Sequence, residues 1–373
     1  MRTIIIGLCC LAIAVIAAGS RTIHFPDRPP NQVAVHFRLQ EKAVSLHEPV
    51  VVLFEVHNGL SQPITVTVGA LIRQYFDFSL TTPSGQVLRK DNTPPPHMVT
   101  VGEGKVSVAP GTDYKEPLVM NQWFPFATQG TYTLTSKLLS DIETEDGSFQ
   151  AEGEIAQLRV NPRDLARLNK ICAELAKQVE TAPNATAAQE PARTLSYVED
   201  PIAVPYLARV LPTNTRIDVS WLPRVPKELS TLNTLTYEKA IAGLQRIGND
   251  AAVEVLLSAL NNNPNDIGDQ ASRALSQMED RISNPRLKET VKQAVQHSSE
   301  RARNEFIKTQ IAYLDYRDPD LQATAIQTLM KMDYNALEQA EPALQRLAND
   351  PSQPAKVVAD AKAALQRLHP RNN

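Results

Sequence analysis

The stretch YEKAIAGLQRIGNDAAVEVLLSAL, residues 237–260, holds two helical patterns back to back. Apolar residues recur at the three- and four-residue spacing of one helical face, first before and then after a corner at Asn249: Ile241, Leu244 and Ile247, then Val253, Leu256 and Leu260. Asn is a favoured helix N-cap, because its side-chain oxygen accepts hydrogen bonds from first-turn amides. The stretch therefore predicts a helical hairpin, and neither helix can bury its apolar face without neighbouring hairpins.

A second copy of the pattern, ARTLSYVEDPIAVPYLARVL, precedes the first and has Asp200 in the place of Asn249. Similar caps recur along the chain, each followed by a Pro that is preset for the first helical turn: Asn161-Pro162, Asp200-Pro201, Asn284-Pro285, Asp318-Pro319 and Asp350-Pro351, the last in competition with Pro354. Caps at this spacing predict a row of helix pairs over residues 161–373.

Residues 162–369 resemble the HEAT-repeat family, whose units read as a helix, an acidic or Gly corner, and then Ala-Val-x-x-Leu. Weaker echoes bring the expected number of units to about five: Ala274, Leu275, Met278, Leu329, Met332, Leu365 and Leu368. The resemblance implies an α-solenoid with an extended concave surface, and hence a protein or peptide partner.

Residues 31–160 instead show a period of two, which indicates half-buried strands. Apolar residues alternate with polar ones over residues 33–39, 50–56, 64–68 and 76–80. Turn signals separate the runs, and each supplies a residue that tolerates a positive φ or presets it: Asn58-Gly59, Pro83-Ser84-Gly85, Pro110-Gly111-Thr112 and Asp146-Gly147. Seven or more short strands at this spacing predict an antiparallel sandwich.

This segment resembles bacterial immunoglobulin-like modules in EVHNGLSQPITV, LTTPSGQVL and GTYTL, where Tyr132 is expected to hydrogen-bond back to the backbone at a corner. The predicted fold class is therefore multidomain, all-β plus all-α. An immunoglobulin-like antiparallel β-sandwich over residues 22–160 precedes a HEAT-like α-solenoid over residues 161–373. The bacterial intracellular proteinase inhibitor family shares this kind of sandwich pattern, but no inhibitory loop can be matched to it residue by residue.

Residues 1–20, MRTIIIGLCCLAIAVIAAGS, predict a signal peptide: one Arg, an apolar run and a small-residue end. The chain is accordingly expected to be exported, to the periplasm or beyond the cell. The alternative is an uncleaved anchor, although an apolar run of about 15 residues is short of the roughly 20 that span a bilayer. After cleavage only Cys172 remains, so no internal disulfide is expected, and Cys172 beside an apolar stripe is interpreted as a half-buried structural thiol.

The sequence lacks the common catalytic motifs: HExxH, GxSxG, a Walker loop, GxGxxG and paired CxxC. Its net charge is -3, and it contains no run of like charges that would suit nucleic acid. The seven His residues do not form a spaced metal-ligand cluster. We therefore expect no enzyme activity, no cofactor, no metal and no nucleic-acid partner.

One candidate binding site lies in a predicted insertion, residues 212–236, which lengthens the spacing between two hairpins. Insertions in repeat arrays often emerge on the binding face, and Trp beside Arg is frequent in contact surfaces. Trp221, Arg224 and Lys227 are therefore predicted to form a contact patch. The alternative is that Trp221 packs over an exposed helix groove.

A second aromatic cluster, Trp123, Phe124 and Phe126, is predicted to serve the sandwich core and to cover a sheet edge. An exposed patch for a partner is the alternative interpretation.

Together these features favour an exported, non-enzymatic protein-binding or scaffold protein of the bacterial cell envelope. The alternatives are an enzyme accessory, such as the HEAT-repeat phycobilin lyases, and a proteinase inhibitor that acts through the sandwich loops.

Overall fold

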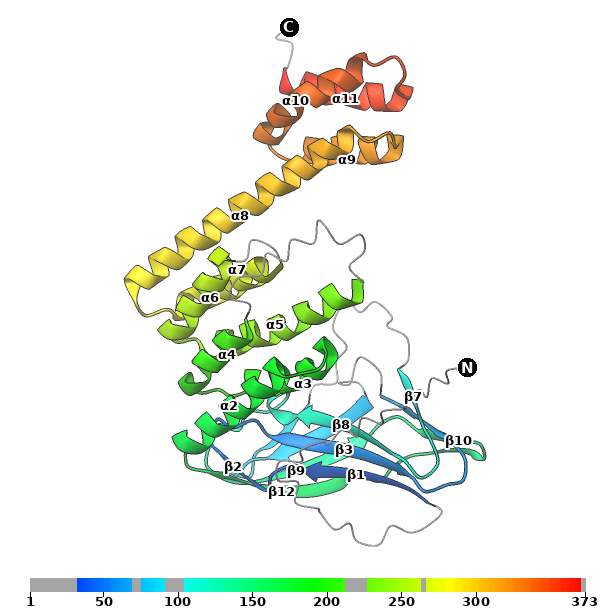
Figure 1. Ribbon diagram of the computed structural model, residues 1–373, viewed down its shortest axis with the longest axis vertical. Coiled ribbons are helices and arrows are strands. Elements are labelled where there is room, and N and C mark those ends of the chain that lie inside the picture. Colours follow the sequence, from blue (N-terminus) through cyan, green and yellow to red (C-terminus); the bar gives the residue numbers. More distant parts are fainter. Residues whose placement is uncertain (1–31, 69–74, 91–103, 212–226, 263–265, 370–373) are drawn as a thin grey trace, which may run out of the picture.

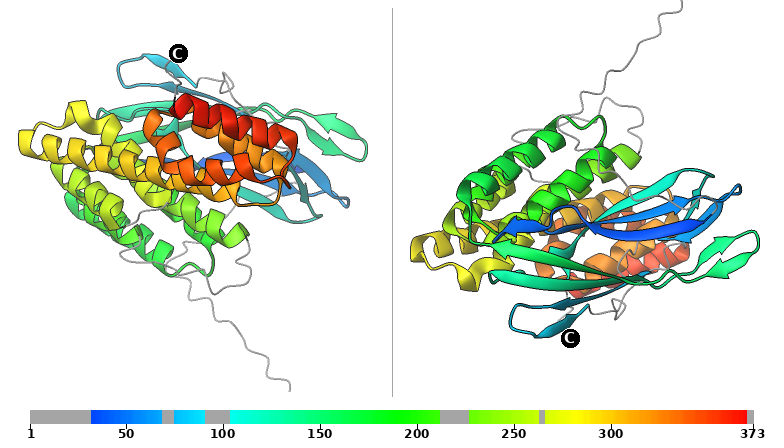
Figure 2. Two further views of the ribbon diagram at one scale, coloured as in Figure 1. Left: turned by 90° about the horizontal axis from the view of Figure 1, so that it is seen from above. Right: turned by 90° about the horizontal axis from the view of Figure 1, so that it is seen from below.

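The computed structural model describes residues 32–68, 75–90, 104–211, 227–262 and 266–369. A β-rich region comes first and an all-helical region follows it (Figure 1). The last strand ends at Asn161 and the first described α-helix begins at Leu165. The predicted order of a β region and then an α region is thus confirmed, and from below the strands lie in front of the helices (Figure 2).

Within the described ranges the β region holds twelve strands in three sheets. The sheet orders are β1-β3-β8, β11-β10-β4-β7 and β2-β12-β9-β5-β6. The strands are β1 Val33–Leu39, β2 Ala43–Ser45, β3 Val51–Asn58, β4 Ile64–Thr67, β5 Phe76–Thr81, β6 Val87–Arg89, β7 Lys105–Val108, β8 Asp113–Val119, β9 Gly130–Leu138, β10 Ile142–Thr144, β11 Gly147–Phe149 and β12 Glu154–Asn161.

The described strand pairs are antiparallel except at one edge, where β2 runs parallel to β12. Asn161 lies opposite Ser45 in that pair, and the Asn161 carbonyl accepts a hydrogen bond from the Leu46 amide at 3.0 Å. The prediction that Asn161 caps a helix is therefore wrong, because β2 takes its backbone into the sheet. Asp164 caps the helix instead, accepting from the Arg167 amide at 3.0 Å.

Aromatic side chains fill the centre of the β region. Phe54 and Phe76 are fully buried with ring centroids 4.9 Å apart, and Phe37 packs against both. The Tyr132 hydroxyl donates to the Thr128 carbonyl at 2.8 Å, which is the corner hydrogen bond expected from the sequence. These contacts join strands that lie far apart in the chain into one core.

The aromatic cluster at residues 123–126 belongs to this core, as its first interpretation predicted. Phe124 and Phe126 are buried, and the half-buried Trp123 ring lies 5.0 Å from the Phe78 ring.

Two kinds of constraint explain the glycines of the predicted turns. Gly85, Gly111 and Gly147 adopt positive φ, where a side chain would be strained. Gly59 does not adopt a positive φ. Its requirement is space, because a Cβ there would lie 2.5 Å from the Gln32 carbonyl oxygen.

The described helical region contains ten α-helices, and the pairs α2/α3, α4/α5 and α6/α7 are stacked in chain order away from the β region (Figure 1). The helices are α2 Leu165–Glu180, α3 Ala185–Ser196, α4 Val204–Val210, α5 Lys227–Ile247, α6 Asp250–Asn262, α7 Asp266–Met278, α8 Pro285–Leu314, α9 Pro319–Lys331, α10 Tyr334–Asn349 and α11 Ala355–Leu368.

Most of the predicted caps start helices. Asn284 and Asp318 cap α8 and α9, Asn249 accepts from the Ala252 amide at the start of α6, and Asp200 caps the 3-10 turn that leads into α4. At Asp350 the prediction is wrong. That residue ends α10, and α11 begins after Pro354, the competing start noted in the sequence.

The corner at Asn249 forms as predicted, with Gly248 in the left-handed conformation between α5 and α6, although these two helices belong to neighbouring pairs. Leu244 and Leu256 are completely buried in a core shared by α2–α8. A Cβ at Gly243 would lie 2.9 Å from the Ser196 Cα, so this glycine permits the close packing of α5 on α3. Residues 227–236, the last part of the predicted insertion, form the beginning of α5.

The stack of helix pairs ends at α8, a single helix of 30 residues. No Gly or Pro follows Pro285 within it, so no residue turns the chain. Its first half packs on the core of α2–α7, and its last turns pack on a separate core with α9–α11. Between the two, residues 299–306 are exposed on all sides, and α8 crosses this span as a diagonal helix (Figure 1).

We expect Leu256→Ala to lower the free energy of unfolding by about 2 to 5 kcal/mol, because it leaves a cavity in a closely packed core. Glu254→Ala, on the exposed face of the same helix, should change it by less than about 0.5 kcal/mol. Urea titration followed by circular dichroism measures both variants. Equal losses in the two variants would show that this face of α6 is not buried.

Candidate functional site

The contact patch predicted from the sequence falls largely outside the described part of the chain. Trp221 and Arg224 lie outside the described residues. Lys227 is the first residue of α5, at a position where only the backbone is described. This prediction therefore stays untested, and the candidate site is found elsewhere.

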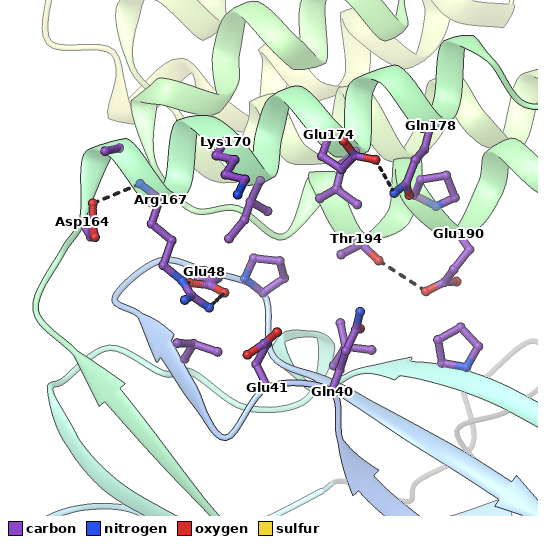
Figure 3. A pocket seen from close by; sticks show the side chains of 18 residues that line it. Gln40, Glu41, Glu48, Asp164, Arg167, Lys170, Glu174, Gln178, Glu190 and Thr194 are labelled. Carbon is purple, nitrogen blue, oxygen red and sulfur yellow. Dashed lines mark hydrogen bonds and ion pairs between the residues drawn. The ribbon is translucent and has the colours of Figure 1, made fainter. Parts of the chain in front are cut away.

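A cleft of about 860 Å³ lies between the β region and helices α2 and α3 (Figure 3). The turn between β1 and β2 forms one wall with Gln40 and Glu41. Helix α2 forms the opposite wall, and Lys170, Glu174 and Gln178 line it at four-residue spacing, which places them on one helical face. Both regions of the chain are needed to enclose this space.

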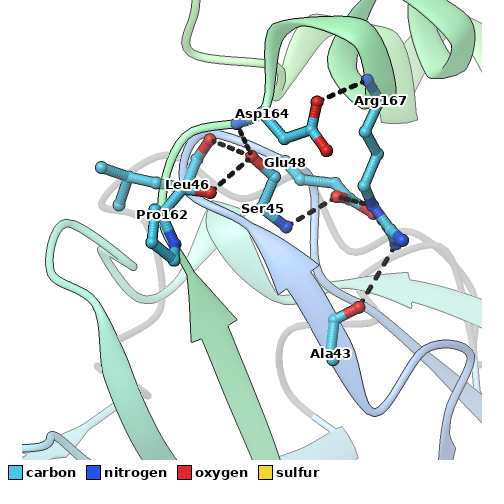
Figure 4. Close-up of polar contacts among 7 residues, drawn as sticks. All are labelled: Ala43, Ser45, Leu46, Glu48, Pro162, Asp164 and Arg167. Carbon is cyan, nitrogen blue, oxygen red and sulfur yellow. Dashed lines mark hydrogen bonds and ion pairs between the residues drawn. The ribbon is translucent and has the colours of Figure 1, made fainter.

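A buried carboxylate, Glu48, joins the β region to α2 at the cleft (Figure 4). Glu48 is 5% exposed, and the Arg167 guanidinium donates to both of its oxygens, at 2.6 and 2.8 Å. The Ser45 amide donates to Glu48 at 2.8 Å, and the Asp164 amide donates to the Ser45 hydroxyl, also at 2.8 Å. These hydrogen bonds tie β2 to the first turn of α2. The bonds from Arg167 to Glu48 also raise the pKa of Arg167.

A second polar contact joins β8 to α3. Arg193 forms an ion pair with Glu190 on its own helix and lies 3.8 Å from Glu116 on β8. The Tyr114 hydroxyl donates to Glu116 at 3.3 Å. Burial is the largest cause that raises the pKa of Glu116, and Glu190 adds to it, so together they outweigh the opposing effect of Arg193.

A third pair holds the junction itself. Asp200 is 1% exposed and accepts from the Arg163 guanidinium at 2.6 and 3.0 Å. Burial alone would raise the pKa of Asp200, but the hydrogen bonds from Arg163 and from the Ile202 amide lower it below its usual value. The carboxylate therefore stays ionised and fixes the chain after β12 against the start of α4.

The lining of the cleft is part apolar and part acidic. Ile171 and Leu175 on α2 face Val44 and Pro49 of the β region across it. Five lining side chains carry carboxylates and two are basic: Glu41, Glu48, Asp164, Glu174 and Glu190, against Arg167 and Lys170. Such a surface suits the binding of a ligand that has both apolar and polar groups.

The described residues offer little for covalent chemistry at this site. Cys172 lies on α2 but is completely buried rather than half-buried, and burial, followed by the charge of Asp200, raises its pKa to about 12. A thiol in that state is neutral and a poor nucleophile. No three His, Cys, Asp or Glu side chains of the described ranges are grouped to hold a metal ion.

Comparison with known proteins identifies no family. No family model matches the chain, and no curated protein matches it. Among solved structures, Spo0M, a sporulation control protein from Bacillus subtilis, aligns with 14% identity and a TM-score of 0.19. The alignment covers 39% of this chain and 54% of Spo0M, so this chain spans about half of that structure.

An engineered protein aligns with 18% identity and a TM-score of 0.18, over 54% of this chain and 87% of its own. TM-scores this low do not indicate a shared fold or a shared function. Separately, none of the helices in the described ranges has the length and apolar character needed to cross a membrane.

Substitution of Arg167 tests the contribution of the Arg167–Glu48 ion pair to stability. We expect Arg167→Ala to cost about 2 to 4 kcal/mol, because it leaves the buried Glu48 carboxylate without its charge partner. Lys170→Ala removes an exposed cation from the next turn of the same helix and should cost less than about 0.5 kcal/mol. Denaturant titration compares them. If Arg167→Ala were as mild as Lys170→Ala, Glu48 would not depend on this partner.

The raised pKa of Glu116 predicts that the stability of the folded protein depends on pH. Its raised pKa means that the folded protein holds this proton more tightly than the unfolded chain does, where the value is 4.5. The folded state therefore loses stability as the pH rises from that value through the folded-state pKa. Glu116→Gln cannot ionise, so we expect its melting temperature to exceed that of the wild type at neutral pH and to approach it near pH 4.

Melting curves at several pH values measure this difference, with Glu152→Gln as a control at an exposed loop residue. A Glu116→Gln protein that is less stable than the wild type at neutral pH would refute the interpretation.

Proposed function

We propose that this is an exported, non-enzymatic binding or scaffold protein that captures a segment of a partner protein in the cleft between the β region and α2–α3. The observation that carries the proposal is the cleft itself: its volume of about 860 Å³ lies in the range of ligand pockets. The ion pair of Arg167 with Glu48 joins the two regions beside the cleft, and the pair of Arg163 with Asp200 holds the chain at the junction, before any partner arrives. A preformed site loses less conformational freedom on binding.

The proposal includes a finer description of the two regions. The Tyr132 corner and the shared aromatic core support an immunoglobulin-like sandwich. In the helical region α3 contacts α5 and α5 contacts α7, while α2 contacts α4 and α4 contacts α6. Contacts between each helix and the next but one support a HEAT-like solenoid over α2–α7.

Export rests on residues 1–20, whose composition is that of a signal peptide and which lie outside the described residues. A periplasmic or extracellular location agrees with a binding role for the cell envelope. Fusion of residues 1–30 to a reporter enzyme that is active only after export tests this part on its own.

Selection from a random peptide library on the full chain tests the cleft. We expect peptides to be selected and their affinity to fall at least tenfold in Gln178→Trp, because the added indole fills the space between α2 and the β region. Gln296→Trp is the matched control. Both glutamines are exposed on a helix, and each donates one hydrogen bond to a Glu four residues away.

Fluorescence polarisation with the selected peptides gives the affinities. Peptides that bind equally well to Gln178→Trp and to the wild type would place binding outside the cleft, and failure to select any peptide would count against the function.

A further inference from the structure

Not all of the carboxylates that line the cleft have an ion-pair or helix-cap partner within the described part of the protein. Both oxygens of Glu48 are taken by Arg167, Asp164 caps α2, and Glu190 is paired with Arg193. Glu41 and Glu174 remain. Among the described residues neither forms an ion pair. The charge of Glu41 acts on Arg167 only from a distance, as the last but one of the causes that raise the pKa of Arg167, and Glu174 accepts only a neutral hydrogen bond from Gln178, at 3.1 Å.

These two carboxylates lie on opposite walls of the same cleft. Glu41 comes from the turn between β1 and β2, and Glu174 comes from α2 (Figure 3). Lys170, one turn before Glu174, is the only basic side chain among the described lining residues that has no ion pair within the described chain. The lining as a whole keeps more carboxylates than cations, so a cation between the walls would interact favourably with both sides.

Next to these carboxylates lies an apolar surface. Ile171 and Leu175 line the cleft at four-residue spacing on α2 and are only half-buried, whereas Val44 and Pro49 of the β region are already buried. A small polyamine would satisfy the carboxylates but would leave this surface against water. A peptide would cover both, with a cationic side chain between the carboxylates and an apolar side chain beside it.

We infer that the cleft recognises a peptide segment in which a Lys or Arg is adjacent to an apolar residue, with Glu41 and Glu174 as the partners of the cation. The inference rests on the proposed function and names the chemistry of its partner. Because both carboxylates are exposed, their attraction is screened by solvent and falls with added salt. Charge thus selects the segment, while the apolar contact supplies much of the affinity.

The probes are acetylated and amidated pentapeptides in which two positions are lysine, norleucine or glutamate and the neighbouring positions are leucine or serine. We expect peptides with lysine beside leucine to bind the full chain most tightly and glutamate peptides to bind least. Glu41→Gln/Glu174→Gln should weaken the lysine peptides about three- to tenfold and leave the norleucine peptides unchanged.

The matched control is Glu152→Gln/Glu289→Gln, which makes the same change in net charge outside the cleft. Glu152 lies in an exposed loop, and Glu289 accepts from Gln293 four residues along its helix, just as Glu174 accepts from Gln178. This control should bind the lysine peptides as the wild type does. Higher salt should reduce the affinity of the wild type for lysine peptides and have little effect on Glu41→Gln/Glu174→Gln.

Three results would overturn the inference. If norleucine peptides bind as tightly as lysine peptides and Gln178→Trp still weakens them, the cleft binds peptides but does not select a cation. If spermidine binds as tightly as the best peptide, the partner is a small cation. If no pentapeptide binds and library selection also fails, the proposed function falls, and the inference falls with it.

Discussion

The pairing of Glu48 with Arg167 is the interaction on which the arrangement of the two regions depends. A carboxylate with 5% exposure is costly to bury unless its oxygens are satisfied, and here a guanidinium and a backbone amide together satisfy them. Arg167 comes from the first turn of α2 and Glu48 from the β region. Because the buried Glu48 carboxylate needs a cationic partner, this pair positions the N-terminal end of α2 against the β region. The path of α2 then determines where the remaining helices stack.

The cleft follows from the same constraint. The Glu48–Arg167 pair holds α2 at its N-terminal end, and α3 contacts β8, so the helical wall of the cleft is held at two places. The face of α2 between these contacts carries polar and apolar side chains that the β region does not fully cover. The cleft is the space that this arrangement leaves open.

Local chemistry was readable from the sequence, and long-range chemistry was not. The caps at Asn249, Asn284 and Asp318 depend on neighbouring residues, and the order of β and α regions follows from hydrophobic period. The parallel pairing of β2 with β12 and the contact between Glu48 and Arg167 join residues more than a hundred positions apart, and no local pattern marks them. The long α8 was detectable, because its sequence lacks a turn residue, but regular cap spacing suggested hairpins instead.

The direction of the last three helices depends on the number of residues in the exposed middle of α8. Residues 299–306 touch neither hydrophobic core, and the ion pair of Arg303 with Asp333 at the start of α10 is exposed, so core packing does not fix their number. Each residue of an α-helix adds about 100° of rotation and about 1.5 Å of rise. One residue gained or lost there would swing α9–α11 roughly a quarter turn around the axis of α8 while both cores stayed intact. The angular setting of this end of the molecule is therefore adjustable by small insertions or deletions that cost little stability.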